Sequence, residues 1–194
     1  MRKLERKDLW SLEEYAEKRT AFRGQVMAHK KNRNLQIGPH VRLLFEDRLT
    51  MQYQVQEMLR AERIFEAENI QDELNTYNAL IPGGRNWKAT MFIEFEDIAV
   101  RQQALTKLIG IEDKTWMRVT GYDPMYAVAD EDMARENADK TSSVHFMRFE
   151  LTLVMVRALQ TGADLSAGVS HANYNYSVAP VAGALRAALL ADLD

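Results

Sequence analysis

The chain has 194 residues, of which 46% are hydrophobic and 27% charged, and this is enough to bury one sizeable core. A net charge of −3 gives no bulk attraction to nucleic acid or to an anionic membrane, and zero cysteines exclude disulfides, thiolate metal sites and thiol nucleophiles. No apolar run approaches the roughly 20 residues of a membrane helix, and the charged start has no apolar signal-peptide core. We therefore expect a cytoplasmic protein.

The beginning of the chain predicts a helix from Ser11 to about Lys31. "SLEE" at 11–14 is a capping-box pattern, in which a serine and a glutamate satisfy the first backbone N–H groups. Arg19 lies inside the apolar stripe of this helix, where a charge is unexpected. The apolar members of the stripe are Leu12, Tyr15, Phe22 and Val26.

A second, longer helix is expected over residues 41–66. Gly38 and Pro39 interrupt the preceding pattern, and no Pro or Gly follows until after residue 66. A shorter helix is expected from about 70 to 79, ended by "IPGG" at 81–84.

The second half of the chain changes to the alternating period of β-strands. In "WKATMFIEF" at 87–95 every second residue is apolar, which predicts a strand with one buried face. The further expected strands are 115–121, 125–130, 144–151 and 164–170, and the further expected helices are 98–109, 152–162 and about 180–190. The polar stretch 130–140 predicts a short surface helix or a loop.

This order favours an α+β fold, in which N-terminal helices pack on a mainly antiparallel or mixed sheet from the C-terminal half. We expect a single domain, 1–194, with a helical part over about 1–80 and a strand-containing part over about 85–194.

Two carboxylates stand out on the expected long helix. At 100° per residue, Glu62 and Glu66 share the inward stripe with Val55 and Leu59, and Arg48 lies there as well. Arg48 is about 21 Å from Glu62 along such a helix, so it cannot neutralise that carboxylate. An unpaired buried carboxylate costs several kcal/mol, so a cation must lie nearby or the carboxylates are not buried.

Three interpretations of these carboxylates remain open. The stripe could end near Leu59 or Phe65, leaving both carboxylates in water. Arg19 or Arg23 of the first helix could pair with them, so that Arg19, Arg48, Glu62 and Glu66 form a structural polar cluster. Alternatively, Glu62 and Glu66, with His40 or His29, could hold iron or another hard divalent cation as a metal site.

Two further histidines are expected to face the core. His145 is in phase with the apolar residues of its strand, and His171 ends another strand in the same way. If a parallel crossover joins the two strands, these histidines lie roughly 20 Å apart; only an antiparallel arrangement would bring them together. The sequence contains neither a serine nucleophile elbow nor a phosphate loop, so it predicts no catalytic residues.

The sequence resembles a known bacterial family over nearly its whole length. The resemblance is carried by "DLWSLEEYAEKR", "HKKNRNLQIGPHVRLLFEDRLTMQYQVQEMLRAERIFE", "LIPGGRNWKATMFIEFED", "LIGIED" and "SSVHFMRFEL". The family is catalogued as domain of unknown function 3501, and it brings no catalytic residues to carry over. Genes of this family often lie beside those for rubrerythrin and an iron–sulfur oxidoreductase, so the resemblance implies an accessory role in peroxide handling or iron-dependent electron transfer with these redox partners.

These observations give three hypotheses of function. The first is a non-catalytic accessory or binding protein that works with a redox system. The second is a metal-binding protein or metal-dependent enzyme that uses the helix carboxylates and a histidine. The third is a self-associating scaffold, such as a homodimer, built on the long helix.

Overall fold

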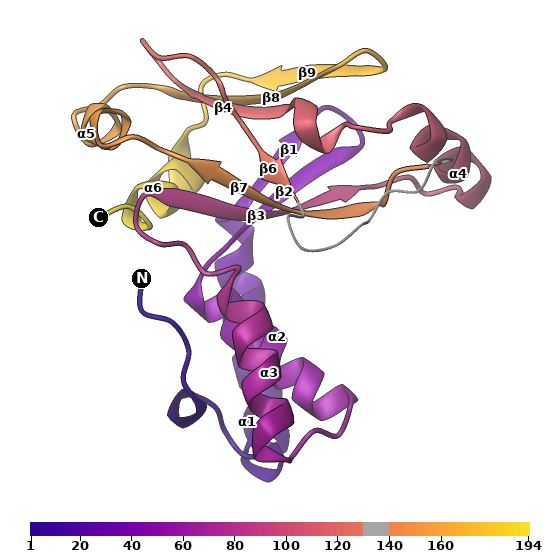
Figure 1. The fold of residues 1–194 in the computed structure, drawn as a ribbon, viewed down its shortest axis with the longest axis vertical. Helices are drawn as coiled ribbons and strands as arrows, with labels where there is room; N and C mark the ends of the chain where they lie inside the picture. The colour runs from indigo at the N-terminus through magenta and orange to yellow at the C-terminus, as the bar shows by residue number, and fades with distance from the viewer. Residues whose placement is uncertain (130–139) are drawn as a thin grey trace.

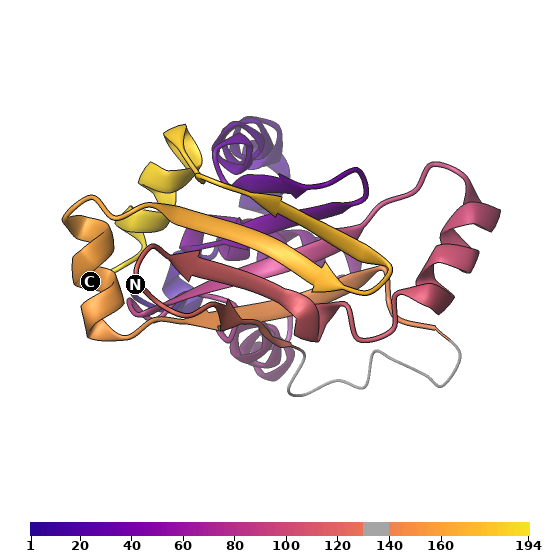
Figure 2. The same ribbon diagram turned by 90° about the horizontal axis from the view of Figure 1, so that it is seen from above.

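The computed structural model describes residues 1–129 and 140–194, and it consists of two stacked antiparallel sheets from which a helical arm projects (Figure 1). Seen from above, the sheets lie one over the other (Figure 2). The predicted α+β class is confirmed. The expected surface helix or loop at 130–140 lies, except for Lys140, outside the described residues.

The first sheet, sheet A, is the one to which the arm is attached. Its order is β1-β2-β3-β7-β6, with all neighbours antiparallel. The strand predicted at 87–95 is confirmed as β3, which ends at Ile93, and its residues Trp87, Ala89, Met91 and Ile93 are buried as expected, whereas Phe95 follows the strand and is partly buried. The strands are β1 (Asn34–Ile37), β2 (Val41–Glu46), β3 (Asn86–Ile93), β6 (Val128–Ala129) and β7 (Val144–Glu150).

The second sheet, sheet B, covers the other face of the main core. Its order is β5-β4-β8-β9, again antiparallel. Alternate residues of both sheets point toward each other, and this buries one large apolar cluster between them. The strands are β4 (Thr115–Val119), β5 (Met125–Tyr126), β8 (Leu165–His171) and β9 (Tyr174–Val178).

Three helices form the arm: α1 (Leu12–Lys31), α2 (Arg48–Ala61) and α3 (Ala67–Asn78). A short 3-10 turn that precedes α1, η1 (Arg6–Asp8), packs against α3. The predicted first helix is confirmed, including its capping box between Ser11 and Glu14. The arm buries its own two apolar clusters, separate from the core between the sheets.

The single helix expected over 41–66 is wrong. Residues 41–46 form strand β2, and Asp47 then caps α2, accepting a hydrogen bond from the Thr50 backbone N–H. The helix also ends early, because Arg63 adopts a left-handed backbone with φ of 53°. The chain reverses there, so 41–66 is a strand, a helix and a turn.

The remaining helices flank the two sheets. They are α4 (Ile98–Lys107), η2 (Glu112–Lys114), α5 (Leu153–Gln160) and α6 (Gly183–Ala191), which confirms the three helices expected in the second half. The C-terminal helix α6 packs against sheet A, where the Trp87 indole N–H of β3 donates to the Leu189 carbonyl of α6 at 2.9 Å. In the described part of the chain no helix is both long and apolar enough to cross a membrane.

Candidate functional site

The far end of the arm carries an open apolar pocket of about 320 Å³. It lies where η1, the start of α1 and the α2–α3 turn come together, and Arg6 and Ser11 contribute to its rim. Most of its wall consists of apolar side chains, namely Leu9, Trp10, Leu12, Leu59, Ile64, Phe65 and Ile70.

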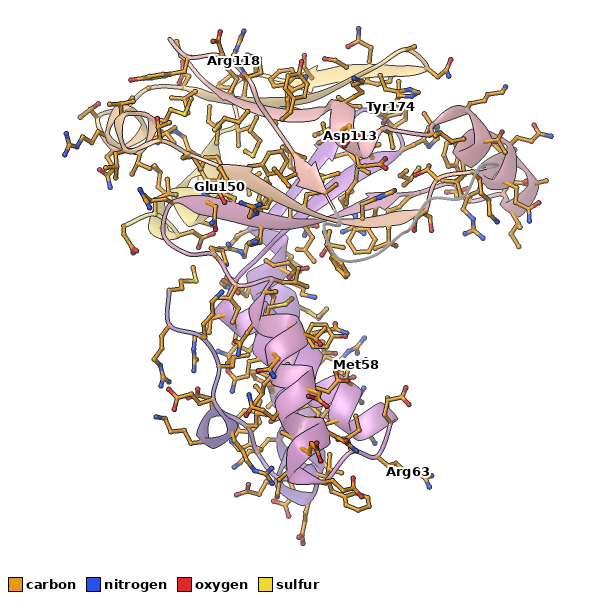
Figure 3. The ribbon with its side chains drawn as sticks, viewed as in Figure 1. Met58, Arg63, Asp113, Arg118, Glu150 and Tyr174 are labelled. Carbon is orange, nitrogen blue, oxygen red and sulfur yellow. The ribbon has the colours of Figure 1, made fainter. Side chains whose placement is uncertain are left out.

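The turn between α2 and α3 creates this pocket. Glu62 ends α2, Arg63 takes the left-handed conformation, and the Ile64 N–H donates to the Leu59 carbonyl at 2.9 Å. Ile64 therefore packs against the arm's apolar cluster, whereas the next side chain, Phe65, is 67% exposed. In Figure 3, Arg63 lies at the far end of the arm, away from the sheets.

The tip of the arm, defined here as residues 6–17 and 59–73, is acidic. It holds nine carboxylates and four basic side chains, a formal charge of −5, whereas the whole chain carries −3. Burial, followed by the charges of Glu62 and Asp72, raises the pKa of Glu73. Among the described residues, none of these three carboxylates has an ion-pair partner within 4 Å, so no ion pair neutralises the charge of these three, whereas Asp8 pairs with Arg2 and Arg48.

A charged contact holds the first two helices of the arm together. Arg19 donates to the two oxygens of Glu57 at 2.8 and 2.7 Å, and the Tyr15 hydroxyl donates to the same carboxylate at 2.6 Å. The hydrogen bond from Arg19 lowers the pKa of Glu57 to about 2, against the opposing effect of burial. Burial and the carboxylate together raise the pKa of Tyr15. Glu57 is thus held ionised, and α1 is fixed against α2.

A buried charge network lies at the base of the arm. Arg33, only 2% exposed, donates to the Phe45 carbonyl at 2.8 Å and pairs with Asp192 beside the C-terminus. Arg33 Nη1 lies 3.4 Å from the Asp47 carboxylate, and His29 Nε2 lies 2.5 Å from the same carboxylate. Burial raises the pKa of Asp192, and Arg33 opposes this rise. The network joins the end of α1, the start of α2 and the C-terminal segment.

The carboxylates singled out in the sequence do not face the core. Glu62 directly follows α2 as its C-cap residue and Glu66 directly precedes α3, and both side chains are exposed. Because the chain reverses at Arg63, the two residues no longer share one helical stripe.

The expected cluster of these carboxylates with two arginines is not assembled. Arg19 pairs instead with Glu57 of α2, which is not one of the carboxylates predicted for this cluster. Arg48 pairs instead with Asp8 of η1, at 2.9 Å between Nη2 and Oδ2. The predicted pairing of Arg19 or Arg23 with Glu62 and Glu66 is therefore not found, because the carboxylate that Arg19 contacts is that of Glu57.

The histidines proposed as metal ligands lie in other environments. His40 precedes β2 at the sheet, stacks on Phe95 with ring centroids 3.9 Å apart, and its Nδ1 is 3.0 Å from the Glu94 carbonyl. His29 belongs to the network at the base of the arm. In the described ranges, no three His, Asp or Glu side chains come together in a way that could hold a metal ion.

The other two histidines lie in different sheets. His145, 1% exposed, is in β7 of sheet A, where its Nε2 is 3.0 Å from both the Thr141 hydroxyl and the Ser142 carbonyl. His171 ends β8 of sheet B, with Nε2 3.1 Å from the Ile109 carbonyl. The predicted inward orientation of His145 is confirmed. The crossover considered for the two strands is wrong, because β7 and β8 do not share a sheet.

Fold and site together define an α+β protein with two stacked sheets and a projecting helical arm that ends in an apolar, acidic tip. The chain belongs to the family described as Protein of unknown function (DUF3501), whose family model matches residues 3–193. This confirms the resemblance found in the sequence.

A solved structure shares the whole fold. It is the crystal structure of a novel protein of unknown function from Burkholderia pseudomallei K96243, which is 47% identical in sequence, with a TM-score of 0.94 and 100% of each chain covered. No curated protein matches the chain. The comparisons therefore support the family and the fold.

Proposed function

We propose that this chain is a non-catalytic accessory protein that binds a partner protein through the tip of its helical arm. The observation that carries the proposal is the open apolar pocket with Phe65 exposed beside it. Monomeric proteins rarely leave large apolar side chains gathered around a hollow, and such places commonly receive a partner.

The arm suits this role mechanically. The contact of Glu57 with Arg19 and Tyr15 fixes α1 against α2, and Arg33 fixes the base. A rigid arm presents the tip without a large loss of conformational entropy on binding. The pocket is therefore pre-formed in the free protein.

The family resemblance suggests which partners to test. It implies the rubrerythrin or the iron–sulfur oxidoreductase of the same redox system. The proposal is thus an accessory protein that docks on one of these two proteins and brings no reacting group of its own.

Biolayer interferometry with the purified full-length chain and each redox protein tests this proposal. We expect one of them to bind, and Phe65→Ser to weaken binding by about tenfold or more, as for a central apolar anchor. Ile98→Ser is the matched control, because Ile98 on α4 is 63% exposed but lies outside the arm. Binding by neither protein would contradict the redox link, and equal losses in both variants would contradict the tip as the site.

The other hypotheses have less support. The metal hypothesis with Glu62, Glu66 and His40 finds no assembled ligand set among the residues described, and elemental analysis of protein from iron-supplemented cells tests it directly. The scaffold hypothesis rested on a long helix that the chain does not form. Light scattering of the purified chain tests whether it self-associates.

A further inference from the structure

The charge of the tip indicates which kind of segment it receives. No Lys or Arg occurs between residues 64 and 84, so every charged side chain of α3 is acidic. The first turn of α1 adds Glu13 and Glu14, both exposed. Arg6 is the one basic side chain in the pocket wall, and the formal charge of −5 on the tip already includes it. A cationic segment is therefore drawn to this surface, whereas an anionic one is repelled.

The pocket also limits the shape of its occupant. A cavity of about 150 Å³ holds one benzene molecule, so about 320 Å³ has room for two bulky apolar side chains. An amphipathic helix presents two such side chains together at positions i and i+3 or i+4. Its flanking residues then lie over the acidic surfaces of α1 and α3.

We propose that the tip binds a basic amphipathic helix of its partner, with two apolar side chains in the pocket and Lys or Arg side chains against the carboxylates of α1 and α3. This rests on the proposed function, because it names the chemistry that the same tip recognises. The occupant is a segment of another protein, and a second copy of this chain is an outcome of the test.

Fluorescence anisotropy with two labelled 14-residue peptides tests the inference. Both place leucine at helical spacing, but one carries only lysine and the other only glutamate at its polar positions. With the full-length chain, we expect the lysine peptide to bind at least about tenfold more tightly. We expect its affinity to fall about three- to tenfold when the salt is raised from about 0.05 to 0.3 M, because the contacts lie at the surface.

Matched variants place the binding on the tip. Glu13→Gln with Glu68→Gln removes two exposed tip carboxylates, and we expect binding of the lysine peptide to weaken about threefold. Glu96→Gln with Asp123→Asn removes two exposed carboxylates outside the tip and should leave the affinity unchanged. Equal binding of both peptides, equal losses in the two double variants, or self-association of the chain through the tip would overturn the inference.

The two proposals fail in different ways. If a redox protein binds through Phe65 and neither salt nor the Glu13/Glu68 variant changes its affinity, the basic-helix inference fails and the proposed function stands. If the lysine peptide behaves as expected and neither redox protein binds, the redox link fails and the basic-helix inference stands.

Discussion

Glu57 accepts hydrogen bonds from both Arg19 and Tyr15, so the folded arm favours its charged form. Its pKa is about 2 in the folded protein, against an ordinary value of 4.5. The folded pKa is depressed, so this carboxylate stabilises the arm above pH 4.5 and loses that effect as the pH falls toward 2. Acid should therefore weaken the joint between α1 and α2.

Glu57→Gln tests this joint. We expect the free energy of unfolding to fall by about 1–2 kcal/mol at pH 6, since charge-assisted hydrogen bonds are lost from a partly exposed site. The loss of unfolding free energy should be less than half as large at pH 3, because at that pH the Glu57 carboxylate of the wild-type protein is largely protonated in the unfolded state. Urea unfolding at the two pH values measures it, with Glu17→Gln on the exposed side of α1 as control. An equal deficit at both pH values would contradict the assignment.

At the scale of elements, two glycines have opposite roles. Gly24 lies in the exposed middle of α1, and a Cβ added there meets nothing within 4 Å. Gly168 lies in β8, where a Cβ would be 2.5 Å from the Trp116 ring and 2.8 Å from the Tyr176 carbonyl oxygen. The Trp116 ring lies across this glycine and donates to Ser170 at 2.9 Å.

The same substitution should therefore change stability in opposite directions. Gly24→Ala should stabilise the protein by about 0.5–1 kcal/mol, because alanine loses less entropy in a helix. Gly168→Ala should destabilise it by about 1–3 kcal/mol through overpacking against Trp116. Thermal unfolding measures both, and Trp116 fluorescence should shift only in the second variant. A neutral Gly168→Ala would contradict the close packing.

The elements also show why some of the fold was predictable from sequence. Strands β3 and β7 alternate clearly, because each has one buried and one less buried face. In β2 this alternation is lost, because Leu44 and Glu46 on its second face are also buried. The sequence of this segment therefore reads as the start of the helix that follows it. The spacing of Asp47 and Thr50 was the available signal for a new helix start.

The candidate site was harder to predict for physical reasons. The pocket exists because Arg63 adopts a left-handed backbone, and no glycine marks that turn in the sequence. The Arg33 network joins residues up to 159 positions apart, which no local periodicity reveals. The sequence identified Arg19 as an unusual charge, but predicting Glu57 as its partner required knowing how α1 packs on α2.

At the scale of the whole molecule, we propose that the arm and the sheets form one domain, because Arg33 links α1, α2 and the C-terminal segment. Removing Arg33 leaves the buried Asp47 and Asp192 carboxylates without this cationic partner. Such a loss typically lowers the free energy of unfolding by about 3–5 kcal/mol.

Calorimetry tests this proposal. The wild-type chain should unfold in a single transition, and Arg33→Met should lower its Tm by about 6–15 °C. Arg42→Met is the control, because Arg42 pairs with Glu94 at the surface and should cost about 1 kcal/mol or less. Two separate transitions in the wild-type protein would contradict the single domain.

The proposed function requires that the tip of the arm is a binding surface. Hydrogen–deuterium exchange of the full chain, with and without whichever redox protein binds, tests it most directly. We predict that binding slows exchange in residues 9–14 and 62–72 and leaves the two sheets unchanged. Slower exchange confined to the sheets, with an unaffected tip, would contradict it.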